Sequence, residues 1–295
     1  MLIKNDFEII NYTSFKIGGK AVIIYYPECD DDFKDLPDNF YVIGNLSNTL
    51  VSSFGINLPL VSLSKIDSIK IDGLNVTAGA GVRGPKLSQT VAEAGLSGLE
   101  FMIGFPGSVG GEVFMNAGAN NQTIADVFSC AKVFSPANGL ITVDKSDMNF
   151  GYRNSVCKEK NWIVIESSFN LQKEKPEIIK QKMADNLEFR KKHQPSLSLP
   201  NCGSVFKNPE NNSAGRLLDE CGVKGLHVGG AKVWENHANF IVNDGTAKSF
   251  DVLELMCEMK VRVKEKFDID LIPEICYLGG NNEEEELLCK QLYQK

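Results

Sequence analysis

The side chains that could do chemistry lie in five short segments of the 295-residue chain. Two segments, residues 44–48 and 104–118, combine glycine with serine and asparagine, so that backbone N–H groups can approach an anion or a flat ring. Three segments each present one reactive side chain: Arg153 after Tyr152, Ser204 in a Gly-Ser-Val turn, and Glu274 after a proline. A guanidinium binds a carboxylate or a phosphate through two parallel hydrogen bonds, and a hydroxyl can deliver a proton.

Each segment also has an ordinary structural explanation. Residues 44–48 could form a plain turn, residues 104–118 a crossover between sheets, and Arg153 and Glu274 could lie in water on the surface. A nucleophilic role for Ser204 is disfavoured, because its segment contains no histidine and the chain has no GxSxG motif. The histidines at 193, 227 and 237 and the eight cysteines lack the spacing of metal ligands, so we expect no metal and reduced thiols.

The composition narrows the class of protein. Hydrophobic residues make up 43% and charged residues 23%, as in ordinary globular proteins, and the net charge of −7 argues against a nucleic-acid-binding surface. No run approaches the about 18 to 20 apolar residues that cross a membrane, and the first residues do not have the pattern of a signal peptide. We therefore expect a cytoplasmic enzyme that acts on small molecules.

Hydrophobic patterns and turn residues predict an α+β fold with strands and helices in mixed order. Pro85 and Gly95 bracket a short helix, Asn138-Gly139 turns a hairpin, and Pro176 opens a long helix, while Ser213 and Ser249 are expected as N-caps of two further helices. No GxGxxG or Walker A motif is present, so a nucleotide cofactor must be held by another device. The expected strands cover residues 21–27, 41–44, 75–82, 162–171, 239–243 and 270–276, and the acidic run 283–286 is expected to be solvated and frayed.

The order of the motifs resembles one family. NYTSFKIGG at residues 11–19, the Ser47-Asn48 loop, GFPGSVGG, NAGA, YRNS, GSVFKNP, AGRLLDECGVKG, GGAKV, HANFIVN and LIPE follow one another as in the UDP-N-acetylenolpyruvoylglucosamine reductases, known as MurB. The resemblance covers roughly residues 10–279. GSVFKNP and HANFIVN are specific to this family, whereas the glycine loops occur more widely among flavoproteins.

This resemblance implies a fold and a reaction. The fold is the FAD-binding fold of the vanillyl-alcohol-oxidase/PCMH type, with two α+β lobes at residues 1–70 and 71–192. An α+β substrate-binding lobe at residues 193–280 and an acidic tail at 281–295 follow. In the implied reaction NADPH reduces FAD, and the flavin then reduces the enolpyruvyl ether of UDP-N-acetylglucosamine to UDP-N-acetylmuramate, a precursor of peptidoglycan.

The resemblance also assigns roles to single residues. Arg153 and Glu274 stabilise the negative charge that develops on the substrate carboxylate, and Ser204 protonates the neighbouring carbon. The implied partners are the UDP-sugar and NADPH, without nucleic acid or membrane, and the oligomeric state is left open, a monomer included. The residues placed on FAD are Gly44, Asn45, Ser47, Asn48, Gly107, Ser108, Gly110, Gly111 and Asn116, and those placed on the substrate are Tyr152, Asn208, Lys224, His193 and His237.

Three features depart from the family pattern. GNLSN replaces GxGSN, so Leu46 stands at a glycine position, where its side chain could shift the loop relative to the pyrophosphate. His193 stands where a lysine is common before Gln-Pro, so a phosphate contact could depend on pH. Between Trp162 and Pro176 there is no room for the tyrosine-bearing insertion of the longer type, so the chain resembles the shorter type.

Two other functions remain open. An FAD oxidase of a sugar or an alcohol would share the flavin fold, although GSVFKNP, HANFIVN and LIPE argue against it. A flavin- or UDP-sugar-binding protein without catalysis is suggested by the altered GNLSN loop, but the presence of Arg153, Ser204 and Glu274 together disfavours it.

Overall fold

Residues 1–293, which the computed structural model describes, fold into two units that each have their own apolar core. Unit 1 comprises residues 1–4, 24–45 and 60–190, and unit 2 comprises residues 5–23, 46–59 and 191–295. Strands β1 (Leu2–Glu8) and β2 (Lys20–Tyr26) contribute residues to both units. Helices and strands occur in mixed order along the chain, which confirms the predicted α+β class.

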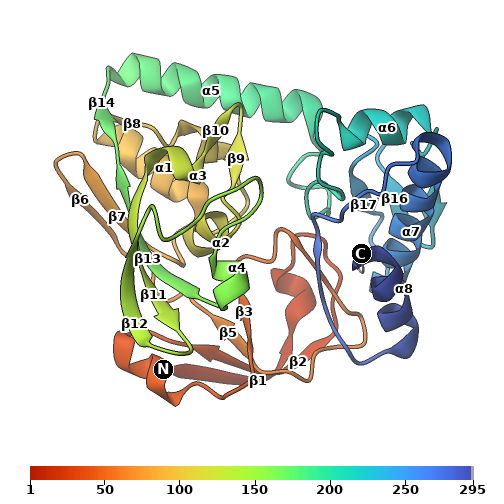
Figure 1. Ribbon diagram of the computed structural model, residues 1–295, viewed down its shortest axis with the longest axis horizontal. Helices are drawn as coiled ribbons and strands as arrows, with labels where there is room; N and C mark the ends of the chain where they lie inside the picture. Colours follow the sequence, from red (N-terminus) through yellow and green to blue (C-terminus); the bar gives the residue numbers. More distant parts are fainter. Residues whose placement is uncertain (294–295) are drawn as a thin grey trace. The chain divides into compact units, whose positions relative to one another are not determined.

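Unit 1 is built on a five-stranded antiparallel sheet of order β12-β11-β13-β7-β6 (Figure 1). Helices α1 and α2 pack on this sheet, because Leu87 and Val91 of α1 and Val109 and Val113 of α2 share one core with the strands. The elements of this unit are β3 (Tyr41–Ile43), β5 (Leu60–Ser62), β6 (Ile69–Asp72), β7 (Asn75–Gly79), α1 (Gly84–Glu93), β8 (Leu96–Ser97), α2 (Val109–Phe114), β9 (Gly118–Ala119), β10 (Gln122–Thr123), α3 (Ile124–Val127), β11 (Phe128–Ser135), β12 (Gly139–Asp144), α4 (Cys157–Lys160), β13 (Ile163–Asn170), β14 (Gln172–Lys173) and the greater part of α5 (Pro176–His193).

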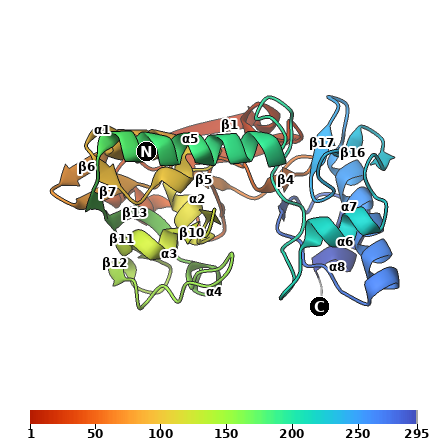
Figure 2. The same cartoon turned by 90° about the horizontal axis from the view of Figure 1, so that it is seen from above.

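The local turn and helix signals of unit 1 are confirmed. Helix α1 carries Pro85 in its first turn, and Gly95 follows it with a φ of 70° that suits glycine. Strands β11 and β12 form the predicted hairpin, in which Ser135 pairs with Gly139. The long helix predicted from Pro176 is α5, which is seen from the side in Figure 1 and from above in Figure 2.

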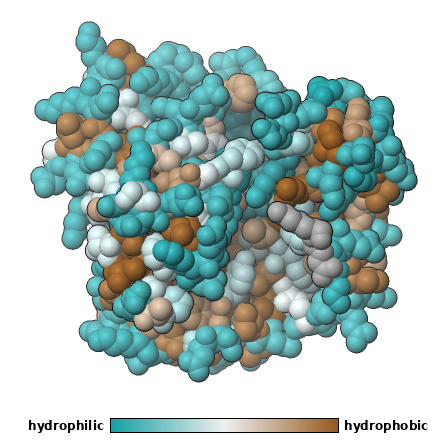
Figure 3. Space-filling view, viewed as in Figure 1, coloured by the Kyte–Doolittle hydropathy of each residue, from teal (hydrophilic) through white to brown (hydrophobic). Residues whose placement is uncertain are grey.

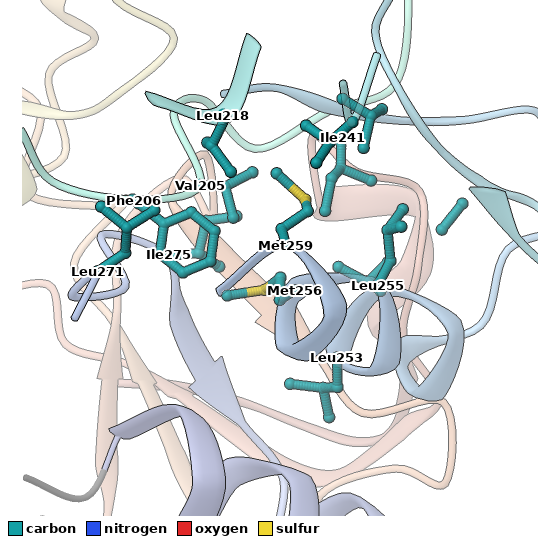
Figure 4. Close-up of a cluster of buried hydrophobic side chains, with 14 of the residues drawn as sticks. Val205, Phe206, Leu218, Ile241, Leu253, Leu255, Met256, Met259, Leu271 and Ile275 are labelled. Atoms are coloured by element: carbon teal, nitrogen blue, oxygen red, sulfur yellow. The ribbon is translucent and has the colours of Figure 1, made fainter. Parts of the chain in front are cut away.

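Unit 2 packs α6 and α7 against the three-stranded antiparallel sheet β15-β16-β17. Figure 4 shows Met256 and Met259 of α7 in the same buried cluster as Val205, Phe206 and Ile275. The residues next to Ser204 and Glu274 in the chain are therefore anchored in this core. The elements of this unit are β4 (Thr49–Val51), α6 (Ala214–Glu220), β15 (His227–Val228), β16 (Ala231–Val233), β17 (Ile241–Asn243), α7 (Ser249–Phe267), β18 (Cys276–Leu278) and α8 (Glu283–Tyr293).

Two predictions for unit 2 were wrong in detail. The strand expected at residues 270–276 begins only at Cys276, because Pro273 lacks the N–H that a paired strand position needs and makes only an isolated bridge with Phe206. Ser249 is the first residue of α7, with Lys248 at the N-cap position. The Ser249 hydroxyl bonds the carboxylate of Glu285 instead of capping its own helix. Ser213, by contrast, is the predicted N-cap of α6 and accepts the N–H of Arg216.

The acidic run is not frayed. It opens α8, and the side chain of Glu285 is fully buried. Its carboxylate accepts hydrogen bonds from the hydroxyls of Ser52 and Tyr277, each at 2.6 Å, and from Ser249. Residues 294 and 295 of the predicted tail lie outside the described residues. The carboxylate therefore ties α8 to the end of β4, to α7 and to β18.

We expect Glu285→Ala to lower the free energy of unfolding by about 3 kcal/mol, because three buried hydroxyls lose a charged acceptor and each orphaned group costs about 1–3 kcal/mol. Urea denaturation followed by circular dichroism measures the change. Glu284→Ala, at an exposed position in the same turn, is the matched control and should change stability by less than about 0.5 kcal/mol. Equal effects of the two substitutions would contradict a role for the buried carboxylate.

Among residues 1–293, no helix is both long and apolar enough to cross a bilayer. On the face seen in Figure 3, hydrophobic residues form separate patches among hydrophilic ones. The described chain also contains no group of three or more His, Cys, Asp or Glu side chains placed to hold a metal ion.

Candidate active site

In unit 1, separate stretches of backbone come together at Asn45. Its side-chain amide donates to the carbonyl of Pro106, and its Oδ1 accepts a hydrogen bond from Nη1 of Arg83. A side chain on Gly44 would press against the next segment, since a Cβ there would lie 3.1 Å from Oγ of Ser108. The structure thus brings Gly44 and Asn45 of the first glycine loop against the GFPGS segment.

The second glycine loop leads into α2. The N–H of Gly110 donates to the carbonyl of Ala80 at 3.0 Å, and a Cβ on Gly110 would lie only 2.8 Å from Cβ of Ala80. Close packing therefore requires glycine at this position. At Gly111 a Cβ would meet Oγ of Ser108 at 3.9 Å, an ordinary contact, so neighbouring protein atoms do not require glycine there. A ligand that approaches the backbone is a physical reason for Gly111.

Arg153 lies beside the end of α2. Its Nη2 donates to the carbonyl of Gly118 at 3.3 Å, and its guanidinium stands 5.2 Å from the ring centroid of Tyr152. Asn116 holds the neighbouring backbone, because its amide donates to the carbonyl of Gly151 at 2.9 Å and its Oδ1 accepts the N–H of Ala125 at 3.0 Å. The side chain of Asn116 therefore joins the NAGA motif to the backbone just before the YRNS motif, and both of its polar atoms form hydrogen bonds within the protein.

In unit 2, Ser204 and Glu274 occupy neighbouring stretches of backbone. The N–H of Glu274 donates to the carbonyl of Val205 at 2.8 Å, directly after Ser204 in the chain. Asn48 adjoins the same place, since its side-chain amide donates to the carbonyl of Glu274 at 2.9 Å. The structure thus brings together two predicted catalytic residues and one predicted cofactor residue that are far apart in the sequence.

A buried asparagine fixes the backbone that follows Ser204. The side chain of Asn239 accepts the N–H of Phe206 at 2.9 Å and donates to the carbonyl of the same residue at 2.8 Å. Its backbone carbonyl accepts the N–H of Val205 at 2.9 Å. Asn239 belongs to the HANFIVN motif, so this motif holds the backbone that follows Ser204 in place. No local sequence pattern predicts these hydrogen bonds.

Among the predicted substrate residues of unit 2, Asn208 and His237 lie beside the start of α6 and Lys224 beside its end. His237 accepts the N–H of Asn239 at its Nδ1, and burial lowers the pKa of its imidazole, with smaller contributions in the same direction from Lys224 and His193. Lys224 forms an ion pair with Asp219 at 2.7 Å. The remaining substrate residue, Asn208, accepts the N–H of Ala214, the first residue of α6, at 3.0 Å.

The altered loop position, Leu46, adopts a φ of 50°. This is the left-handed conformation that glycine takes freely and that costs other residues about 1–2 kcal/mol. The Leu46 side chain is buried, which offsets that cost. Ser47, the next residue, is partly exposed in a turn.

Two residues near the first loop were not predicted from the sequence. Arg83 stands at the N-cap position of α1, and Glu112 lies inside α2. The sequence feature that could have indicated Arg83 is a single basic residue directly before a helix that begins with Gly-Pro. Glu112 had no signal, because a glutamate in a short helix is ordinarily exposed.

Comparisons with known proteins agree with this arrangement. The family described as "FAD binding domain" matches residues 34–144, and the family described as "UDP-N-acetylenolpyruvoylglucosamine reductase, C-terminal domain" matches residues 194–278. The UDP-N-acetylenolpyruvoylglucosamine reductase of Caldicellulosiruptor bescii is 41% identical over 282 residues, which cover 93% of this chain and 90% of the relative. That of Bacillus subtilis is 38% identical, with 92% and 93% covered.

A solved structure gives the same result for the fold. The crystal structure of the UDP-N-acetylenolpyruvylglucosamine reductase (MurB) from Thermus caldophilus superposes with a TM-score of 0.82 at 35% sequence identity. The match covers 94% of this chain and 98% of that chain. The FAD-binding fold followed by a C-terminal substrate lobe, expected from the motif order, is thereby confirmed.

Proposed function

Because this chain belongs to the UDP-N-acetylenolpyruvoylglucosamine reductase family, we propose that it reduces UDP-N-acetylenolpyruvoylglucosamine to UDP-N-acetylmuramate, with FAD as cofactor and NADPH as electron donor. The observation that carries the proposal is the hydrogen bond from the N–H of Glu274 to Val205, which sets a carboxyl side chain next to the Ser204 turn. NADPH and the UDP-sugar are cytoplasmic metabolites, so the proposed place of the reaction is the cytoplasm.

The side chains present fit FAD. Asn45 and Arg83 offer an amide and a guanidinium beside the GFPGS backbone, and Gly111 leaves the start of α2 open to a ligand. A guanidinium next to backbone N–H groups suits the diphosphate of a dinucleotide. We infer that residues 1–70 and 71–192 hold FAD and that residues 193–280 hold the substrate. The roles of Ser47, Asn48, Gly107, Ser108, Gly110 and Asn116 toward FAD, direct or through the backbone, belong to the same proposal.

The chemistry divides between the cofactor and this chain. When bound, FAD supplies a hydride, obtained from NADPH, to one carbon of the enolpyruvyl double bond. The electron pair of that bond moves toward the substrate carboxylate, where Arg153 and Glu274 stabilise the developing negative charge. Ser204 gives its proton to the other carbon and recovers one from solvent, so that one hydride and one proton are added in total.

The substrate side chains are proposed to hold the UDP portion. Lys224 provides an ammonium group for the diphosphate, and Asn208 and His237 lie beside the start of α6. Burial keeps His237 neutral at pH 7, since it lowers the pKa of the imidazole, and its role is therefore that of a hydrogen-bonding and packing group. Tyr152, which stacks on Arg153, and His193 complete the proposed set.

We expect Lys224→Ala to raise KM for the UDP-sugar roughly tenfold while kcat changes less than twofold, because a charged hydrogen bond to a phosphate contributes about 1.5 kcal/mol to binding in both ground and transition states. Steady-state kinetics at saturating NADPH measure both constants. Lys232→Ala, which removes a surface lysine paired with Glu235, is the matched control. A fall in kcat with an unchanged KM would contradict the binding role.

The proposed function is tested on the purified protein. We expect a flavin absorption spectrum, rapid bleaching by NADPH under anaerobic conditions, and recovery of the oxidised spectrum when the enolpyruvyl substrate is added. Bleaching by a sugar or an alcohol instead of NADPH would identify an oxidase. A protein that binds flavin but returns no oxidised spectrum with the substrate would overturn the proposed reaction.

A further inference from the structure

The carboxyl group of Glu112 is a buried ionisable group in unit 1. The residue is 4% exposed, and neither Oε1 nor Oε2 has a hydrogen-bond partner in the described chain. The buried carboxylate of Glu285, by comparison, is met by three hydroxyls. An ionised carboxylate without partners is strongly disfavoured in a protein interior.

The backbone of two glycines, Gly84 at the start of α1 and Gly107 in the second glycine loop, lies against this carboxyl group. A Cβ on Gly107 would lie 2.9 Å from its Oε1, and a Cβ on Gly84 would lie 3.0 Å from its Cδ. Both positions must therefore be glycine for Glu112 to occupy its place. The two glycines are themselves joined, since the N–H of Gly84 donates to the carbonyl of Gly107 at 3.3 Å.

The charge state of Glu112 depends on one neighbour. Burial raises the pKa of the carboxyl to about 8, and the field of Arg83 acts in the opposite direction. Among the described residues, Arg83 is the one charged group whose field acts on it. Lys86, in the first turn of α1, and Arg190, whose side chain packs on Gly104, stand on the surrounding elements without such an effect. At pH 7 the carboxyl group therefore holds its proton.

Arg83 is engaged elsewhere in this state. Its Nη1 donates to Oδ1 of Asn45, whose amide in turn donates to Pro106. The guanidinium is exposed, at the N-cap position of the ten-residue helix α1. Its remaining N–H groups are suited to phosphate oxygens, which arginine binds through two parallel hydrogen bonds. If Glu112 lost its proton, the buried anion would attract the guanidinium of Arg83, whose field already acts on it, away from Asn45.

We propose that Arg83 is a further cofactor-binding residue, which contacts the diphosphate of FAD, and that Glu112 is a positioning residue whose protonated carboxyl leaves Arg83 with Asn45. This inference rests on the proposed function only in taking FAD as the ligand. Since the free carboxyl loses its proton as the pH rises through about 8, FAD affinity is full below that pH and falls above it.

The experiment measures FAD release from the holoenzyme. Dilution series at pH 7 and pH 9, with released flavin followed by its fluorescence, give the dissociation constant at each pH. If only the protein with a protonated Glu112 binds FAD at full strength, the FAD dissociation constant of the wild-type protein rises about tenfold from pH 7 to pH 9. Glu112→Gln, which stays uncharged, should bind equally at both pH values. Arg83→Gln should bind FAD more weakly than the wild-type protein at pH 7, and its dissociation constant should change little between pH 7 and pH 9.

The matched control is Glu93→Gln, an exposed glutamate of α1 that accepts from Gln89 and should follow the wild-type curve. A wild-type constant independent of pH, or a Glu112→Gln variant with the wild-type pH dependence, overturns the role of Glu112. An Arg83→Gln variant that binds as tightly as wild type overturns the role of Arg83. If Glu112→Gln does not fold, the pH dependence of FAD binding by the wild-type protein and by Arg83→Gln still tests the proposal. A protein that binds no FAD at all contradicts the proposed function instead.

Discussion

Replacing Ser204 by alanine is expected to lower kcat by about 10²–10⁴-fold while FAD stays bound, because a positioned proton donor contributes about that factor. The substitution should leave the fold intact. The backbone of the turn is held by the hydrogen bonds of Val205 and Phe206 to Asn239, none of which uses the serine hydroxyl. The Ser204 side chain is only half-buried, so its loss creates no large cavity.

Two half-reactions separate this effect from a general loss of activity. Stopped-flow absorbance should find the reduction of the flavin by NADPH unchanged and its reoxidation by the enolpyruvyl substrate slowed. Ser198→Ala, at an exposed position just before the turn, is the matched control and should keep both rates. A normal steady-state rate in Ser204→Ala would refute the assignment of this serine as the proton donor.

The second large effect concerns Arg153. We expect Arg153→Gln to lower kcat roughly 10- to 150-fold, because a hydrogen bond to a charged group contributes about 1.5–3 kcal/mol and the charge on the substrate carboxylate grows in the transition state. Arg153→Lys should recover only part of the rate, since a lysine keeps the charge but lacks the planar fork. The backbone φ of 53° at this position is equally strained for all three side chains, so the comparison isolates the head groups.

The measurement is the same reoxidation half-reaction, with kcat and KM determined separately. Lys160→Gln is the matched control, because it removes a nearby surface cation that stacks on Trp162 at 4.5 Å. Its rate should stay within twofold of wild type. If Arg153→Gln raised KM and left kcat unchanged, Arg153 would bind the substrate without favouring the transition state, and the proposed role would fail.

The sequence predicted the parts of the fold that short-range rules determine. Pro85 and Gly95 bracket α1, Asn138-Gly139 turns the β11–β12 hairpin, and Ser213 caps α6, because each rule depends on residues within one turn. It failed where tertiary contacts decide. The composition of the run 283–286 predicts a solvated segment, yet Glu285 is buried, and its hydrogen-bond partners Ser52, Ser249 and Tyr277 come from three other segments of unit 2.

The candidate site was predictable as a set of motifs and not as an arrangement. The motif order indicated Arg153, Ser204 and Glu274, and the structure places Ser204 and Glu274 on neighbouring stretches of backbone in unit 2. The hydrogen bonds that orient them, such as Asn239 to Phe206 and Asn48 to Glu274, join residues far apart in the chain and leave no periodic signal. Glu112 was missed because only the three-dimensional structure shows that its carboxyl group has no hydrogen-bond partner among the described residues.

The parallel pairing of β4 with β18 has a consequence for how the polypeptide is made. Residues 49–51 leave the ribosome long before their strand partner at 276–278 and the Glu285 carboxylate, which lie more than two hundred residues later in the chain. Domains fold as their residues become available, at about 5–20 residues per second. Unit 1 can therefore fold on the nascent chain, whereas the segment around Asn48 must wait until residues 276–285 have been synthesised before its register is set.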